Sequence, residues 1–396
     1  MVDDPERLTN ELLQCLTQDK KRLGLLLGAG CPYSIKDKAG KPLIPDIRGL
    51  TEVVKSEVCC GDCAKPWKNV CGQLLQDTGD EPNIEDILSR VRGLRDLAGS
   101  AEIRGLKKSA LDKLEHNICE SIKKCATNKL KDRSTPYHNL ANWVGAIARS
   151  EPIEVFTTNY DLLLEQALEE LRIPFFDGFV GSCQPFFDPY AIESDKLPPR
   201  WARLWKIHGS INWRSGMVDS SFKVWRASAS DEGGDVVIHP SHLKYEQSRK
   251  MPYLALMDRL RKFLDTPSTA LIVVGYSFGD QHLNDVIIQS LQGTPSTAVF
   301  ALMYGKLADH KFAVDIAKSR NNLTMITTDG SIVGTKATTW REVSEKPDSK
   351  LPDGAVEWAT KTGDGELWKA SFKLGDFVWF GTFLQSISGM MRIVEA

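Results

Sequence analysis

Four short segments of the sequence carry glycines and polar side chains immediately after apolar runs. They are Gly28-Ala29-Gly30, Thr158-Asn159-Tyr160-Asp161, His208-Gly209-Ser210 and Gly275-Tyr276-Ser277-Phe278-Gly279-Asp280. In an open α/β sheet the carboxyl ends of the strands form the ligand crevice, so we expect these turns to converge. Glycines let a backbone approach a diphosphate, and a histidine at a strand end can act as a base. The segments together predict a site that binds a diphosphate-containing ligand and holds one base.

Each segment by itself also fits a purely structural role. The third glycine of the dinucleotide fingerprint is absent, since Tyr33 stands in its place, so Gly28 and Gly30 also fit a plain tight turn. Asp161 is placed to cap the helix that follows, which is worth about 1 kcal/mol. Asn159 precedes that helix by too much to need the same explanation, which favours a ligand role for its side chain.

The elements that position these turns follow from hydrophobic periodicity. Short apolar runs predict strands at residues 22–28, 153–157, 204–207, 270–275, 298–303 and 323–327. Helical spacing predicts helices at residues 5–19, 136–149, 162–171, 253–264 and 283–291. The alternation predicts an α/β fold with a Rossmann-like, mainly parallel sheet of about six strands.

Two parts of the chain depart from this alternation. Residues 51–134 have charged helical patterns and no strand-like runs, so we expect a helical insertion within a nucleotide-binding domain that spans residues 1–330. Residues 331–396 turn polar, with several prolines and glycines, before apolar character returns at residues 372–383. We expect a C-terminal appendage there. The Pro- and aromatic-rich residues 173–200 are predicted to form a loop.

Composition narrows the class of protein. The 396 residues carry a formal net charge of −2 and only short basic runs, so we expect no direct binding of nucleic acid. No run of about 18 apolar residues and no signal-peptide pattern is present, which favours a cytoplasmic protein without a membrane segment. Nine cysteines are too few for a disulfide scaffold. The spacing of Cys59, Cys60, Cys63 and Cys71 leaves a zinc site open as the less favoured alternative to reduced thiols without metal.

The motifs resemble those of the sirtuin family. Pro45-Asp46-Ile47-Arg48 is similar to its Pro-Asp-Phe-Arg segment, and Thr158-Asn159-Tyr160-Asp161 is similar to its Gln-Asn-Ile-Asp segment. His208-Gly209 resembles the catalytic His-Gly pair, and Gly275-Tyr276-Ser277 resembles the late Gly-Thr-Ser turn. The variants Thr-Thr-Asn-Tyr-Asp at residues 157–161, His-Gly-Ser at 208–210 and Gly-Tyr-Ser-Phe-Gly-Asp at 275–280 resemble still more closely those of the bacterial sirtuin-like effectors of antiphage defence. The resemblance extends over about residues 23–328.

The resemblance implies NAD⁺ as substrate and a role for each matched residue. Gly28, Ala29 and Gly30 would line the diphosphate, and Asp46 would accept from the nicotinamide amide. Asn159 would hold the ribose or water, His208 would be the base, and Ser277 would contact the adenosine side. The other candidate NAD⁺ contacts lie in the same turns: Thr158, Asp161, Gly275, Asp280 and His282.

The departures from the family bear on the reaction. Sirtuin deacylases carry a zinc ribbon of two cysteine pairs downstream of the His-Gly strand, whereas this chain has no cysteine after Cys183. Water is therefore the favoured acceptor, which predicts an NAD⁺ glycohydrolase that releases nicotinamide and ADP-ribose. Protein deacylation or ADP-ribosyl transfer is the alternative reaction. A non-catalytic NAD⁺-binding sensor or scaffold subunit is the alternative from another class.

The resemblance also suggests a setting. An enzyme that depletes NAD⁺ must be silent in an uninfected cell, so regulation by assembly is expected. Short sirtuin-like effectors of this kind work with a HerA-type hexameric ATPase. We therefore expect a homo-oligomer and a partner of that type.

Overall fold

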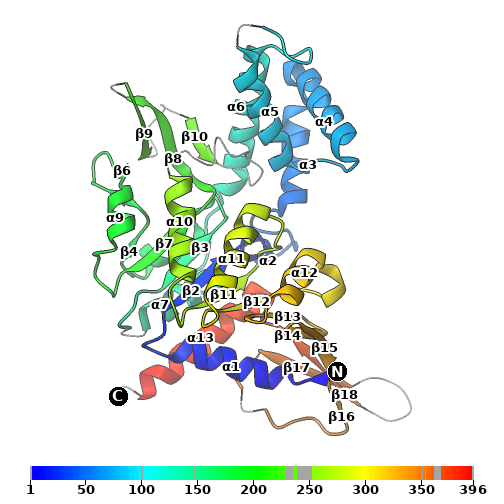
Figure 1. Cartoon of the computed structure of the whole chain (residues 1–396), viewed down its shortest axis with the longest axis vertical. Coiled ribbons are helices and arrows are strands. Elements are labelled where there is room, and N and C mark those ends of the chain that lie inside the picture. Colours follow the sequence, from blue (N-terminus) through cyan, green and yellow to red (C-terminus); the bar gives the residue numbers. More distant parts are fainter. Residues whose placement is uncertain are drawn as a thin grey trace.

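The chain is built around a ten-stranded sheet (Figure 1). The computed structural model describes residues 2–99, 101–146, 149–218, 220–227, 235–238, 252–349, 351–352, 354–360 and 367–394, with the backbone alone for 2, 235–238 and 390–394. All six predicted strands are present: β2 (Leu23–Leu27), β3 (Glu154–Thr157), β7 (Ala202–Lys206), β11 (Ala270–Val274), β12 (Ala298–Leu302) and β13 (Leu323–Ile326). They are neighbours in the order β13-β12-β11-β2-β3-β7, and all pairings are parallel. The predicted Rossmann-like α/β class is confirmed.

The sheet is wider than the six strands that the apolar runs predict. The two-residue strand β4 (Phe175–Phe176) extends it beyond β7 in parallel. At the other end β14 (Gly330–Val333) and β15 (Lys336–Trp340) add antiparallel strands, and β1 (Val2–Asp3) pairs with β15. These edge strands are short or largely polar, so hydrophobic periodicity does not reveal them.

Helices cover both faces of the sheet, which is why its central strands read as continuous apolar runs. One face packs against α1 (Pro5–Thr17), α7 (Pro136–Ala146), α8 (Leu163–Glu170) and α13 (Phe377–Val394). The other packs against α10 (Tyr253–Leu264), α11 (Gln281–Gly293) and α12 (Lys311–Ser319). The five helices predicted around the strands are all present. None of the helices that the structure describes has the length and apolar character needed to cross a membrane.

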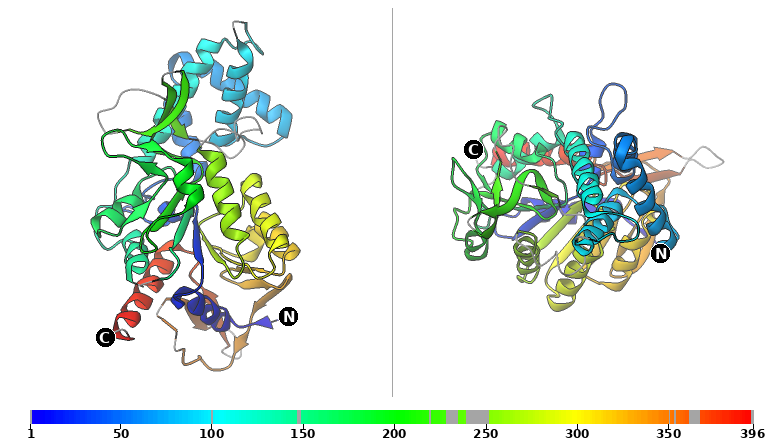
Figure 2. Two further views of the ribbon diagram at one scale, coloured as in Figure 1. Left: turned by 60° about the vertical axis from the view of Figure 1, so that its left-hand side comes forward. Right: turned by 90° about the horizontal axis from the view of Figure 1, so that it is seen from above.

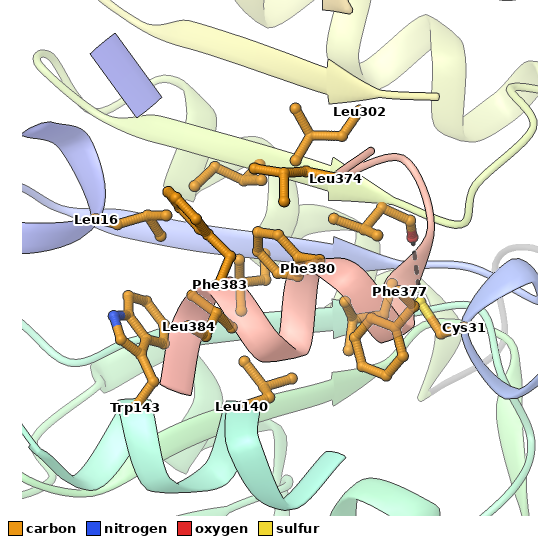
Figure 3. Close-up of a cluster of buried hydrophobic side chains, with 14 of the residues drawn as sticks. Leu16, Cys31, Leu140, Trp143, Leu302, Leu374, Phe377, Phe380, Phe383 and Leu384 are labelled. Atoms are coloured by element: carbon orange, nitrogen blue, oxygen red, sulfur yellow. Dashed lines mark hydrogen bonds between the residues drawn. The ribbon is translucent and has the colours of Figure 1, made fainter. Parts of the chain in front are cut away.

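The segment 331–396, predicted as a C-terminal appendage, contributes to the main sheet and to the main core. Its strand β15 belongs to the main sheet, and its helix α13 packs on α7 in the main core (Figure 3). Phe380, Phe383 and Leu384 of α13 are fully buried against Leu140 and Trp143. Within the described residues of this segment, β16 (Glu342–Val343), β17 (Val356–Thr360) and β18 (Trp368–Phe372) form a three-stranded sheet apart from the main sheet. The apolar run that the sequence shows here is thus a core helix of the main body.

The predicted helical insertion forms a lobe with its own core (Figure 1 and Figure 2). It contains α3 (Ile47–Val58), the short η1 (Gly61–Cys63), α4 (Ala64–Thr78), α5 (Ile84–Ala98) and α6 (Lys108–Ala126). The lobe lies beyond the carboxyl ends of the central strands, next to α2 (Gly30–Ser34), the short helix that follows β2. This position makes the insertion a candidate wall for any site at those strand ends.

Residues 173–200, predicted to be a loop, contain regular structure. Besides β4 they form β5 (Phe179–Val180), β6 (Phe186–Phe187) and α9 (Pro189–Ser194). The strands β5 and β6 join β8 (Gly209–Val218), β9 (Ser221–Arg226) and β10 (Asp235–Ile238) in a second, five-stranded sheet. Strands of two residues leave no periodic signal in the sequence, which explains the wrong prediction.

Candidate functional site

The turns that carry the candidate residues follow four adjacent strands. β11, β2, β3 and β7 lie side by side, so their carboxyl ends share one edge of the sheet. A cavity of about 550 Å³ lies there, a size typical of small-molecule sites. The predicted site residues that line it are Ala29, Gly30, Asp46, Thr158, Asn159, Asp161, His208, Gly275, Ser277 and Asp280. The turns therefore converge as their positions after strands predict.

Gly28 and His282 are placed differently from the expectation. In the described part of the chain neither belongs to the cavity lining. Gly28 is buried, and His282 is exposed in the first turn of α11, where its backbone N–H donates to Asp280. A direct contact of either residue with a ligand in this cavity is therefore not supported.

The glycines bring two turns together. A Cβ on Gly28 would lie 2.4 Å from the carbonyl oxygen of Gly275, and one on Gly30 would lie 2.7 Å from the Gly275 Cα. The N–H groups of Gly28 and Gly30 donate to the carbonyls of Val274 and Gly275. Gly275 itself has φ +67°. These glycines thus serve close packing of the β2 and β11 turns, and the N–H groups of Gly28 and Gly30 are already used within the protein.

Asn159 ties the β3 turn to the β2 turn. Its side-chain Nδ2 donates to the carbonyl oxygen of Gly28 at 3.1 Å, and its backbone N–H donates to Thr157 Oγ1 at 3.1 Å. The first bond fixes the side chain at the cavity wall, and the second fixes the backbone of the turn. The distance of Asn159 from the start of α8 agrees with the expectation that helix capping is not its role.

His208 is a buried histidine held by a buried carboxylate. Its Nε2 lies 2.9 Å from Oδ2 of Asp280, and both side chains are only 4% exposed. The other oxygen of Asp280, Oδ1, accepts the backbone N–H groups of His282 and Leu283 and so caps α11. When Nε2 carries the proton and donates it to Asp280, Nδ1 is left as the acceptor. The first turn of α11 therefore fixes both the orientation and the tautomer of His208.

The pair shifts the pKa of both partners. Burial lowers the pKa of His208, but the hydrogen bond and charge of Asp280, with the charge of Glu85, outweigh it, so the pKa lies above the usual 6.5. Burial raises the pKa of Asp280, yet the hydrogen bond and charge of His208 bring it below the usual 3.8. Asp280 is thus a carboxylate at neutral pH, and His208 is a stronger base than an ordinary histidine.

Asp161 and Asp46 act as helix caps. Asp161 Oδ1 accepts the N–H of Leu163 at the start of α8, and Asp46 Oδ1 accepts the N–H of Gly49 in α3. Burial raises the pKa of Asp161 to about 6, against the charge of Lys206. Both side chains line the cavity while they cap, so capping and ligand contact are compatible for them.

Several cavity residues were not found from the sequence. Asn83 and Glu85 come from α5 and its cap in the insertion, and Tyr304 and His310 follow β12. Tyr160 belongs to a predicted segment, but its role as a wall was not foreseen; its hydroxyl donates to Glu85 Oε1 at 3.3 Å. Glu85 belongs to no matched motif, since Pro45–Arg48 ends before it and Thr158–Asp161 begins about 70 residues after it. Nothing local in the sequence therefore marks it as a site residue.

The charges of the cavity are unbalanced. Four carboxyl groups line it, those of Asp46, Glu85, Asp161 and Asp280, and the described lining contains no lysine or arginine. Such a site favours a ligand with a positive charge at its reacting end.

The Cys59–Cys71 segment lies in the insertion, away from this cavity. Asn117 Nδ2 donates to Cys63 Sγ at 3.3 Å, and Cys60 is exposed. Among the described residues no group of three or more histidine, cysteine or acidic side chains is placed to hold a metal ion.

Residues 153–325 match the SIR2-like domain family. This match covers less than half of the chain. The match includes Asn159, His208 and the Gly275–Asp280 turn. It begins at residue 153 and so does not include the Gly28 turn or Asp46.

Two other comparisons add little to the SIR2-like assignment. A solved structure titled "Structural Basis for the Mechanism and Regulation of Sir2 Enzymes" has 11% sequence identity and a TM-score of 0.37, and covers 81% of this chain and 91% of that chain. A similarity at this level supports no conclusion about function. A comparison with curated proteins found no match.

Proposed function

We propose that the protein is an NAD⁺ glycohydrolase that cleaves the bond between nicotinamide and ribose to give nicotinamide and ADP-ribose. The observation that carries the proposal is the buried His208–Asp280 pair, which lines the cavity of a SIR2-like domain together with Asn159. A protein that only bound a nucleotide would need the glycine turns but not a base held in this way.

The residue set fits the chemistry of this bond. The leaving group is a cationic pyridinium that departs as neutral nicotinamide, so no general acid is needed, unlike hydrolysis of a sugar–oxygen bond with its two carboxyl groups. His208 takes a proton from water as the water oxygen bonds to C1′ of the ribose. Asp280 stabilises the imidazolium that forms and keeps the imidazole in position.

The cavity suits the two ends of the substrate differently. Its carboxyl groups match the cationic nicotinamide ribose, whereas the diphosphate has no lysine or arginine in the described lining. The diphosphate therefore depends on neutral donors, such as backbone N–H groups and the hydroxyls of Thr158 and Ser277. Affinity for NAD⁺ is expected to be modest on this account.

Water is the proposed acceptor. Deacylases of the sirtuin family use a zinc ribbon to frame the acyl-lysine groove, and this chain has no cysteine after Cys183. The insertion, through Leu50, Glu85 and Ile122, forms a wall of the cavity instead.

The test is nicotinamide release from NAD⁺ by the purified protein, alone and with any co-purifying protein. We expect release by the wild type, and loss of release with retained NAD⁺ binding in Asn159→Ala and in His208→Ala. His116→Ala is the matched control, since His116 is exposed on α6 and outside the cavity lining. Thermal melts identify a variant that has lost its fold.

Other outcomes separate the alternative functions. Nicotinamide release only in the presence of an acyl-lysine peptide, with loss of the acyl group, would replace hydrolysis by deacylation. NAD⁺ binding without release under every condition would favour the sensor or scaffold subunit.

The biological setting is also a proposal. We propose that the enzyme depletes NAD⁺ in antiphage defence as a homo-oligomer that works with a HerA-type hexameric ATPase, on the support of the motif resemblance. Co-purification and light scattering test the assembly. A wild-type protein that hydrolyses NAD⁺ at full rate as a monomer, with no ATPase bound, would contradict this setting and leave the glycohydrolase proposal intact.

A further inference from the structure

The helical insertion brings one carboxylate to the cavity that holds the base. Glu85 is the second residue of α5 and is half-buried at the cavity wall. Its backbone N–H donates to Asn83 Oδ1 at 2.8 Å, within the capping box that Asn83 forms with Asp86. The N–H of Ile84 donates to Thr51 Oγ1 of α3 at 2.9 Å. The backbone is therefore held at Glu85 itself and at the residue before it.

Glu85 lies close to His208. The hydroxyl of Tyr160 donates to Glu85 Oε1 at 3.3 Å, and the ring of Tyr160 is 6.5 Å from the imidazole of His208, centre to centre. The charge of Glu85 also helps to raise the pKa of His208. Tyr160 therefore contacts both this carboxylate and the base.

The other carboxyl groups of the cavity have evident structural duties. Asp46 and Asp161 cap α3 and α8, and Asp280 caps α11 while it holds His208. Glu85 instead accepts a hydrogen bond from a tyrosine of the cavity wall. This bond joins Glu85 to a wall residue whose ring also contacts His208.

Cleavage of the nicotinamide–ribose bond moves positive charge. The C1′–N1 bond breaks, its electron pair goes to the nicotinamide nitrogen, and the charge passes from the pyridinium ring to the sugar ring as an oxocarbenium-like centre. The water oxygen then bonds to C1′, and its proton goes to His208. A fixed carboxylate beside the sugar stabilises the charge where it develops.

We propose that Glu85 is a catalytic residue that stabilises the positive charge on the ribose in the transition state, so that the helical insertion completes the active site. This inference rests on the proposed NAD⁺ cleavage. It assigns a chemical role to a lobe that the SIR2-like match does not cover.

The test is the substitution Glu85→Gln, which removes the charge but keeps an acceptor for the Tyr160 hydroxyl. We expect kcat for nicotinamide release to fall by about 100-fold with KM nearly unchanged, because the interaction strengthens only as the sugar becomes cationic. Glu85→Asp, which keeps the charge at a shorter reach, is expected to retain part of kcat.

The matched control is Asp96→Asn. Asp96 is exposed on the same helix and lies outside the cavity lining, where its Oδ1 accepts from Arg95 Nε at 3.1 Å. The control removes the same formal charge from α5 and is expected to leave kcat within about twofold of the wild type, since it has no contact with substrate. Thermal melts of all variants check that the lobe is folded.

The pH profile reports separately on the effect of the Glu85 charge on His208. The charged and titratable groups around His208 are Asp280 at the start of α11, Glu85 on α5, and the hydroxyls of Tyr160 and Tyr276. Loss of the Glu85 charge is expected to move the acid limb of kcat to lower pH.

Two results would overturn the inference. One is a Glu85→Gln enzyme with wild-type kcat, and the other is a rise in KM alone, which would mean ground-state binding of the substrate. Either result counts against the inference only if the wild-type protein releases nicotinamide. Failure of the proposed function appears differently, as no release by the wild type under any condition.

Discussion

Asp280→Asn is the sharpest test of how this site works. The substitution replaces one carboxylate oxygen by NH₂ and removes the charge that faces His208 Nε2 at 2.9 Å. Asparagine is as good a helix N-cap as aspartate, so the bonds from His282 and Leu283 to Oδ1 are expected to remain. The change therefore isolates the effect on the imidazole.

The expected loss follows from the strength of one buried, charge-assisted hydrogen bond. Such a bond is worth about 1.5–3 kcal/mol, which corresponds to a fall in kcat of about 10- to 150-fold when it stabilises the imidazolium. The acid limb of the pH profile should move as well. Asp280 is what raises the pKa of His208 against burial, so without its charge the pKa falls and the limb moves to lower pH.

The assay is the pH dependence of kcat for nicotinamide release, together with thermal melts. Asp188→Asn is the matched control, because Asp188 Oδ1 caps α9 through Tyr190 and Ala191 in the same way but lies outside the cavity lining. Unchanged kcat, or an acid limb that stays in place, would refute the role assigned to the pair.

Three further predictions concern stability. The His208–Asp280 pair should stabilise the fold most between about pH 4 and 6.5, as urea denaturation across pH on the wild type and on Asp280→Asn would measure. The contribution of His208 is present below pH 6.5 and is lost as the pH rises through its raised pKa. The contribution of Asp280 is present above pH 3.8 and is lost as the pH falls through its lowered pKa. Gly275→Ala should lower the free energy of unfolding in urea by about 1–3 kcal/mol, because its Cβ would lie 2.7 Å from the Cys31 backbone nitrogen at φ +67°. Gly79→Ala, at φ +79° with no atom within 4 Å of its Cβ, measures the cost of the backbone conformation alone. Equal losses of stability in the two variants would argue against the close approach. Phe380→Ala should lower the free energy of unfolding by about 3–5 kcal/mol, because the ring is fully buried in the main core. Val378→Ala, at an exposed position of the same helix, is the control. Equal losses of stability in the two variants would mean that α13 does not belong to the main core.

Much of the sheet and of its ligand edge could be predicted from the sequence. A strand buried on both faces is an unbroken apolar run, as in Leu23–Leu27 and Ala270–Val274, and this signal is local. A turn that follows such a run shows its glycines and polar residues at once, which is how Asn159 and His208 were found. Short polar strands such as β15 were missed because pairing in a sheet, and not their own pattern, makes them strands.

The sequence alone thus determined the residue types of the site, the order of the turns that carry them and the presence of a helical insertion. Each of these features depends on residues that are close together in the chain. Only the tertiary structure decided that Asp280 holds His208 across 72 positions, that Glu85 enters the cavity from the insertion, and that α13 belongs to the core. These contacts join segments far apart in the chain. Their formation depends on how strands pair and helices pack, and local periodicity carries no record of which distant face a side chain will meet.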